Sequence, residues 1–327
     1  MDGPVTTALG ARFASINAAY DAVFRPGRLT LGVVVPIEAY PDRAVPSMDE
    51  HLERVRLVER LGFSAVWLRD VPFNDPSFGD AGQVFDPFVY LGGLAVATSR
   101  IALGVASIVL PLRHPAHVAK AAASVDVLSQ GRLLVGVASG DRPTEYPALG
   151  IPFETRSERF RAGVEYIRSV AGSYPRFDNL HDAPEYLDLL PKPHGARLPL
   201  LVTGSSRQTP EWIAQHADGW MTYPRTIDAQ ARVLEDWRER VRRAGRVPQP
   251  VMQPLYVDLD PDPDAPPRPL HLGMRTGLHA LRQHLERLQT VGVHHVALNL
   301  RFNRSDIPTT LETLAEGLLP HLSAQEP

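Results

Sequence analysis

The stretch that decides the fold runs from residue 100 to residue 146 and reads RIALGVASIVLPLRHPAHVAKAAASVDVLSQGRLLVGVASGDRPTEY. Residues 101–110 form a nearly unbroken apolar run rich in β-branched side chains, which is typical of a parallel strand buried on both faces. Pro115 suits the first turn of a following helix, and Gly131 suits its end. Residues 133–138 predict a second buried strand. Because two parallel strands need a crossover between them, this stretch predicts one β-α-β unit.

Polar residues gather where both of these strands end. Ser107 stands late in the first strand, and Ser139, Gly140 and Asp141 follow the second. In parallel α/β proteins the functional sites are built at this edge of the sheet. One isolated serine at this edge would be explained as a small residue at a crowded position. Two serines at the ends of successive strands favour a functional site instead.

The pattern of strand followed by helix repeats along the whole chain. It predicts an α/β fold, a single (β/α)8 TIM-barrel domain over residues 1–327, with an N-terminal helical extension (1–28) and an irregular, variable insertion after strand 4 (172–199). A helix over residues 11–24 covers the barrel floor or forms a dimer contact, and we favour the floor. The eight predicted strands are 29–37, 64–68, 101–110, 133–138, 198–203, 218–223, 251–259 and 295–300.

Local signals add detail to this outline. Ser47 and Glu50 form a capping-box pattern, which predicts that a helix starts at Ser47. Residues 261–269 (PDPDAPPRP) are predicted to form a proline-rich loop without regular structure. The long loop over residues 71–87, which includes Asp80, is of a length that is usually functional or mobile.

Several pieces in a fixed order carry a family resemblance. They are the strand ending in LPLRHP, an alanine-rich helix, a Gly-Arg pair before the next strand, and a glycine-containing turn followed by Glu145 and Tyr146. Together they resemble the signature region of the bacterial luciferase-like flavin monooxygenases, and the resemblance extends over residues 29–322. It implies a TIM barrel that binds reduced FMN, or in some branches the deazaflavin F420, at the C-terminal face. It also implies that residues 172–199 lie over the pocket and help to select the substrate.

The resemblance assigns expected roles to individual residues. Ser107, Ser139 and Gly140 would line the flavin ring or its ribityl chain, and Tyr146 would also reach the cofactor. Asp70, Arg113 and His114 are the candidate catalytic groups, which would face the substrate or the flavin. Many relatives carry an acidic residue followed by histidine after the second strand, but this chain has Asp70 followed by valine, so their histidine chemistry is not carried over.

A second glycine-containing turn follows the predicted fifth strand. Gly204, Ser205 and Ser206 precede Thr209 and Pro210, which suit the N-cap and first position of a helix. By itself this pattern is explained by a tight turn before a capped helix. Because serines and free backbone N–H groups before a helix also bind phosphate, the family resemblance favours the phosphate of FMN or F420 here.

These observations predict a flavin-dependent oxidoreductase. The first hypothesis is a monooxygenase that uses O2 and reduced FMN, supplied by a separate flavin reductase, to oxidise a small organic substrate. Alternatives are an F420-dependent dehydrogenase or reductase on the same fold and a non-catalytic flavin-binding protein. His114 and His117 lack a matching carboxylate pattern on neighbouring strand ends, so no metal site is predicted. Since relatives are commonly dimers, we expect a homodimer.

Composition restricts the remaining possibilities. The 327 residues carry a net charge of −3, so no global field favours nucleic acid or an anionic membrane. The chain contains no cysteine, which excludes disulfides and thiolate metal sites. No targeting segment and no run of about 20 apolar residues is visible. We therefore expect a cytoplasmic protein.

Overall fold

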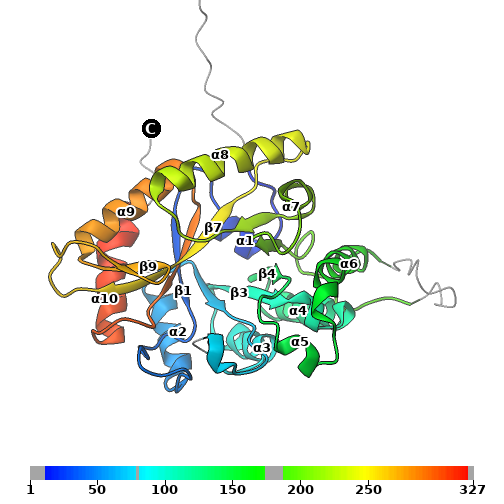
Figure 1. Cartoon of the computed structure of the whole chain (residues 1–327), viewed down its shortest axis with the longest axis horizontal. Coiled ribbons are helices and arrows are strands. Elements are labelled where there is room, and N and C mark those ends of the chain that lie inside the picture. The colour runs from blue at the N-terminus through cyan, green and yellow to red at the C-terminus, as the bar shows by residue number, and fades with distance from the viewer. Residues whose placement is uncertain (1–11, 79–80, 174–186, 323–327) are drawn as a thin grey trace, which may run out of the picture.

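The computed structural model describes residues 12–78, 81–173 and 187–322, and within them eight parallel strands close into a barrel (Figure 1). The strands follow the order β10-β1-β2-β3-β4-β5-β6-β7, and β10 pairs with β7 to complete the ring. The predicted TIM barrel is therefore confirmed. The barrel strands are β1 (Thr30–Val34), β2 (Ala65–Leu68), β3 (Ala102–Val109), β4 (Leu133–Ala138), β5 (Leu200–Thr203), β6 (Gly219–Met221), β7 (Val251–Leu259) and β10 (His295–Asn299).

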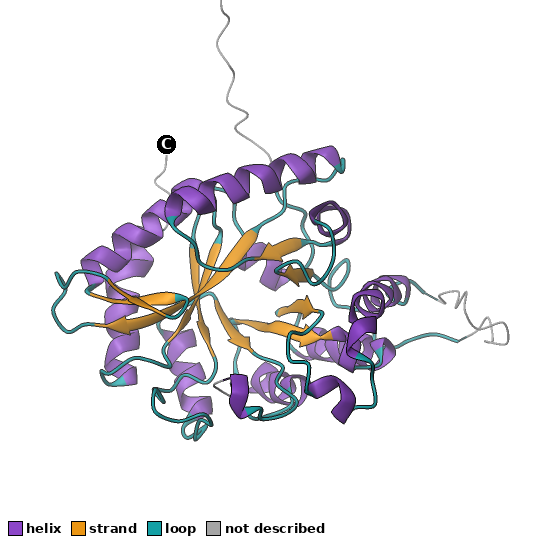
Figure 2. Ribbon diagram, viewed as in Figure 1, coloured by secondary structure: helices purple, strands orange, loops and turns teal. Residues whose placement is uncertain are grey.

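Helices surround the strands on the outside of the barrel (Figure 2). No helix in the described part of the chain is both long enough and apolar enough to cross a membrane. The helices are α1 (Ala18–Val23), α2 (His51–Arg60), α3 (Pro87–Ala97), α4 (Pro115–Leu128), α5 (Glu145–Ala148), α6 (Arg156–Ser169), α7 (Pro210–His216), α8 (Ile227–Arg243), α9 (Leu278–Val291) and α10 (Ile307–Leu318), and single 3-10 turns are η1 (Pro76–Phe78), η2 (Leu110–Leu112), η3 (Phe153–Thr155) and η4 (Leu319–His321).

The core has two layers because successive strand residues point to opposite faces. The larger layer lies between the strands and the helices, and the smaller one fills the barrel interior with side chains such as Trp67, Leu134 and Met221. Strands with both faces buried are expected to read as continuous apolar runs, which is why the sequence pattern located them.

Helix α1 closes the floor of the barrel, as the sequence predicted. The Tyr20 hydroxyl donates to the backbone carbonyl of Asp218 at 2.6 Å, and Asn17 Nδ2 donates to the carbonyl of Leu133 at 2.8 Å. The helix is shorter than the predicted 11–24, because the Asn17 side chain caps it by accepting from the N–H of Tyr20. Residue 11 lies outside the described residues.

The predicted capping box before α2 is wrong. The helix begins at His51, and the preceding Glu50 has a φ of +55° and makes no side-chain cap. Both carboxylate oxygens of the buried Glu38 instead accept from the N–H of Ser47, at 3.0 and 3.1 Å, and one of them also accepts from Met48. This contact from the loop after β1 engages the N–H groups of Ser47 and Met48 outside the helix, and the helix starts later.

The prediction of a purely irregular segment over residues 261–269 is also wrong in part. Its last residues belong to β8 (Arg268–Leu270), which pairs antiparallel with β9 (Gly273–Thr276). β9 pairs with the outer half of β7, so the hairpin projects from the barrel (Figure 1). Pro269 is tolerated because β8 is an edge strand.

Two predicted segments are described only in part. Within the insertion 172–199, residues 174–186 lie outside the described residues, and the described remainder up to residue 199 contains no helix or strand. Asp80 of the loop 71–87 also lies outside them.

Candidate active site

Ser107 faces the barrel interior at its C-terminal mouth. The register of β3 against β4 slips by one residue between Val105 and Ile108, where the Ala106–Ser107 peptide bond is cis. Such a bulge changes the direction of side chains. The Ser107 hydroxyl forms a hydrogen bond with Thr203 Oγ1 on β5 and lies 3.7 Å from the sulfur of Met221. The structure thus gives the barrel mouth a polar patch shared by β3 and β5.

The turn after β4 places Ser139 and Gly140 beside Tyr146. The hydroxyl of the buried Tyr146 donates to the backbone carbonyl of Ser139. Burial raises the pKa of Tyr146 to about 12, so this donor stays protonated at neutral pH. Gly140 has a φ of +73°, and a Cβ there would lie 2.6 Å from Val109 Cγ1. The structure therefore uses Tyr146 to hold the turn and requires glycine at position 140.

The turn after β5 combines free N–H groups with a free cation. Gly204 and Ser206 have φ values of +55° and +42°, and the buried Ser206 hydroxyl donates to the carbonyl of Thr203 at 2.7 Å. Ser205 is exposed. Among the described residues, the backbone N–H groups of Ser205 and Ser206 and the guanidinium of Arg207 have no hydrogen-bond partner. This arrangement suits an anion, although the Ser206 side chain itself stabilises the turn.

The helix after this turn starts as the sequence predicted. Thr209 is the N-cap of α7 and its hydroxyl accepts from the N–H of Trp212 at 3.2 Å, with Pro210 in the first turn. Arg161 of α6 reaches the same region, because its Nη2 donates to Gln208 Oε1 at 3.1 Å. The turn therefore leads directly into a capped helix and lies near a second positive charge.

The buried Asp70 and the partly exposed Arg113 form an ion pair that joins three elements. Asp70 Oδ1 accepts from Arg113 Nη2 at 2.7 Å, and Oδ2 accepts from Arg113 Nε at 3.0 Å and from the N–H of Val109 at 3.1 Å. Arg113 Nη2 also donates to Asp86 at 2.9 Å. Burial lowers the pKa of Arg113, but the Asp70 carboxylate more than offsets this and holds the pKa above its usual value. The pair ties the ends of β2 and β3 to the start of α4.

The structure does not bring His114 to this ion pair. Its ring caps α4 by accepting from the N–H of Ala116 at 3.3 Å, and it lies edge-on to Tyr166 of α6 with the ring centres 6.3 Å apart. These contacts belong to the outer helical layer. We therefore leave His114 out of the proposed site.

Glu145 is a polar group at the mouth that the sequence did not assign to the site. Its residue is 2% exposed, and its Oε1 has no hydrogen-bond partner among the described residues. Burial raises the pKa of Glu145 to about 7, with Asp70 and Asp141 adding to the increase and Arg142 opposing it. In the sequence, Glu145 follows the end of a predicted strand and precedes Tyr146, and this position could have marked it as a candidate site residue. The side chain can hold a proton near neutral pH.

The residues at the C-terminal ends of β3, β4 and β5 fit a flavin-type cofactor. The turn at Ser205 offers backbone donors and the Arg207 charge for a phosphate. Positions 140 and 204 are glycines with positive φ, and a Cβ at Gly204 would lie 3.3 Å from the Tyr223 ring. The backbone can therefore approach a flat ligand closely at both turns.

Comparison with known proteins assigns the class. The sequence profile of the luciferase-like monooxygenases matches residues 29–305, and the chain therefore belongs to this family. An uncharacterized protein of Mycobacterium tuberculosis is 32% identical over 243 residues, covering 67% of this chain and 82% of the relative.

Two solved structures share the fold. The monooxygenase RslO1 from Streptomyces bottropensis superposes with a TM-score of 0.72 at 21% identity, covering 89% of this chain and 99% of that one. An F420-dependent secondary alcohol dehydrogenase also superposes with a TM-score of 0.72, at 18% identity, covering 90% of this chain and 99% of that one. The fold similarity is therefore equal for a monooxygenase and for an F420-dependent enzyme.

Proposed function

We propose that this protein is a monooxygenase that binds reduced FMN at the C-terminal mouth of the barrel and oxidises a small organic substrate. The observation that carries the proposal is the turn after β5, where free N–H groups and Arg207 form an anion site next to the polar patch of Ser107 and Thr203. Reduced FMN, when bound, supplies the electrons that activate O2. The family match supports this chemistry.

In this proposal each group of residues has a separate task. The turn at Gly204, Ser205 and Ser206 holds the phosphate, and Ser107 with the Ser139–Gly140 turn orients the ring and ribityl chain. Tyr146 positions the Ser139 turn. The Asp70–Arg113 pair fixes the wall of the mouth, and Glu145 holds a proton beside it. A separate flavin reductase and a homodimer stay predictions.

Anaerobic titration with reduced FMN and reduced F420, followed by O2 uptake with an added flavin reductase, tests the proposal. Tight FMN binding and substrate-dependent O2 uptake are the expected results. Tight binding of F420 alone assigns the chain to hydride transfer instead. FMN binding without turnover on any substrate class favours the non-catalytic flavin-binding alternative.

Ser205→Asp is expected to weaken FMN binding at least tenfold, because a carboxylate would then face the cofactor phosphate. Ser205 is exposed and its substitution leaves the Ser206–Thr203 hydrogen bond intact, so the fold is expected to persist. Fluorescence titration measures the affinity. Ser205→Ala, which keeps the backbone donors, and Ser124→Asp, which adds the same charge on α4, serve as controls. Unchanged affinity in Ser205→Asp would remove this turn from the site.

Ser107→Val is expected to weaken FMN binding about fivefold, the effect of about 1 kcal/mol from one lost hydrogen bond. The melting temperature of the cofactor-free protein is expected to stay nearly constant, because Thr203 keeps the Met221 sulfur at 3.2 Å. Titration and thermal unfolding are measured together. A large loss of melting temperature with unchanged FMN affinity would show that Ser107 is a packing residue.

The F420 alternative has an observation of its own. Arg207 and Arg161 lie at the proposed phosphate turn, and together they suit a longer anionic tail than that of FMN. An F420-dependent alcohol dehydrogenase also shares this fold. Arg161→Gln separates the two, since it should weaken F420 binding more than FMN binding if F420 is the natural cofactor.

A further inference from the structure

A hollow of about 480 Å³ opens at the end of the barrel opposite the proposed flavin site. Arg168 lies in the last turn of α6, Arg197 precedes β5, Asp218 precedes β6, and Arg246 lies between α8 and β7. These are the N-terminal ends of the strands, whereas the turn at Ser205 follows the C-terminal end of β5. The two ends of β5 are about 10 Å apart at 3.3 Å per residue.

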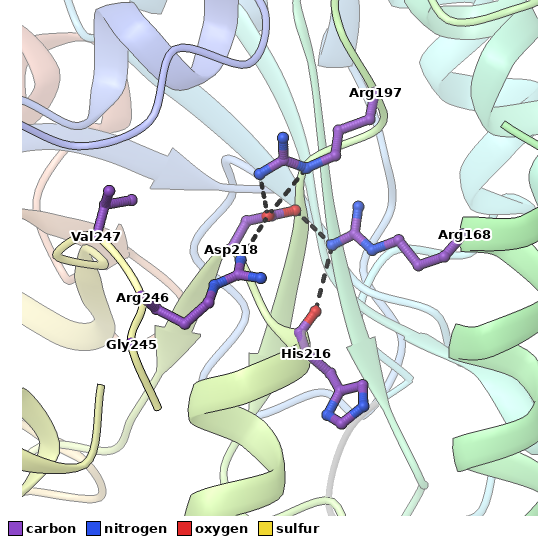
Figure 3. Close-up of a pocket in the computed structure, with 7 residues that line it drawn as sticks. All are labelled: Arg168, Arg197, His216, Asp218, Gly245, Arg246 and Val247. Atoms are coloured by element: carbon purple, nitrogen blue, oxygen red, sulfur yellow. Dashed lines mark hydrogen bonds and ion pairs between the residues drawn. The ribbon is translucent and has the colours of Figure 1, made fainter. Parts of the chain in front are cut away.

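Three guanidinium groups converge on one carboxylate in this hollow (Figure 3). Asp218, whose side chain is 1% exposed, accepts from Arg168 at 2.5 Å and from Arg197 at 2.7 Å, and Arg246 Nη2 lies 3.9 Å from it. Asp218 is the single carboxylate among the described residues that line the hollow. Three positive charges less one negative charge leave an excess of two.

The oxygens of the Asp218 carboxylate already have hydrogen-bond donors, but the arginines still have N–H groups without an acceptor in the described chain. Asp218 also accepts from the N–H of Leu200 at 2.9 Å. Within the described chain, Nη1 of Arg197 and both Nε and Nη1 of Arg246 have no hydrogen-bond partner. The side chains of Arg197 and Arg246 are 33% and 35% exposed, so an ion from solvent can reach them.

We propose that this arginine hollow, lined by Arg168, Arg197, Arg246 and Asp218, binds a small phosphate dianion. Guanidinium groups match phosphate oxygens with paired N–H donors, and two negative charges balance the excess. The ligand is free inorganic phosphate or the phosphate of a small monoester. This site lies apart from the proposed cofactor site and does not depend on it.

Isothermal titration of the full-length, cofactor-free protein with inorganic phosphate tests the proposal, with chloride at matched ionic strength as the background. Saturable binding is expected in the wild type. Arg246→Gln removes the unpartnered Nε and Nη1 donors of one guanidinium while Arg168 and Arg197 still pair with Asp218, and it should weaken phosphate binding at least tenfold. Val247→Glu keeps all three arginines, adds a negative charge to the lining, and should have the same effect even if Arg246→Gln does not fold.

Two further variants and one further ligand complete the experiment. Arg242→Gln, an exposed arginine paired with Glu239 on α8, is the matched control and should bind phosphate as the wild type does. Ser205→Asp should also keep this binding, since it changes only the opposite end of the barrel. Tighter binding of glycerol phosphate would identify a monoester as ligand, and equal or weaker binding would identify free phosphate. No saturable binding by the wild type, or unchanged affinity in Arg246→Gln and Val247→Glu, would overturn the proposal.

Discussion

Asp70→Ala is expected to lower the free energy of unfolding by about 3 kcal/mol, the lower end of the range for removing one partner from a buried ion pair. The substitution takes two hydrogen bonds from Arg113 and leaves the N–H of Val109 without its acceptor. The lower end applies because the Arg113 side chain is 26% exposed and keeps its contact with Asp86. Denaturant unfolding followed by circular dichroism measures the change.

Asp42→Ala is the matched control, because Asp42 is an exposed aspartate in the loop after β1. Surface substitutions of this kind usually change the free energy of unfolding by less than about 0.5 kcal/mol. Asp70→Asn retains an oxygen for the Val109 N–H and is expected to lose less than Asp70→Ala. If Asp70→Ala keeps full stability and FMN affinity but loses turnover, Asp70 acts in catalysis and its anchoring role is wrong.

The barrel could be predicted from the sequence because the apolar runs along the chain coincide with the strands that the fold buries. A strand that is buried on both faces consists of a run of apolar residues. The turns that follow such strands contain glycine, serine or acidic residues. The run before Pro111 and the run ending at Ala138 therefore gave β3 and β4 within one residue. The caps at Thr209 and Pro210 were also predictable, because a cap involves neighbours in sequence.

What the sequence missed depends on contacts between distant residues. Ser47 and Glu50 match a capping box, but Glu38 takes the N–H of Ser47 and moves the start of α2. The residues around Asp218 are spread from position 168 to position 246, and their convergence follows from barrel closure alone. Similarly, the sequence shows the chemical type of His114 but not the direction of its ring, which follows from its place at the start of α4.

Glu145 shows why burial is the hardest quantity to infer from sequence. Its neighbours Arg142 and Thr144 are polar, so the segment reads as an exposed loop. In the folded chain, α5 packs against the end of β4 and Tyr146 anchors it, which removes Glu145 from water. The carboxylate loses hydration without a partner for Oε1 in the described structure, and its pKa rises as a consequence.

This raised pKa makes stability depend on pH in a defined direction. Below about pH 4.5 the Glu145 carboxyl is protonated in both the folded and the unfolded chain, so it costs nothing. Between pH 4.5 and about 7 the unfolded chain releases the proton while the folded chain keeps it, and each step in pH favours unfolding. Above pH 7 the folded protein carries the full cost of a buried, ionised carboxylate.

Glu145→Gln is therefore expected to be about as stable as the wild type at pH 4.5 and more stable at pH 8, by about 3 kcal/mol for a pKa raised from 4.5 to about 7. The amide has a similar shape but no charge to desolvate. Denaturant unfolding of the cofactor-free protein at pH 4.5, 6 and 8 measures the difference between the two proteins. Glu154→Gln, an exposed glutamate in the same connection, should follow the wild type at every pH. Parallel profiles for wild type and Glu145→Gln would mean that Glu145 ionises normally, and its assignment as the group that holds a proton at the mouth would be withdrawn.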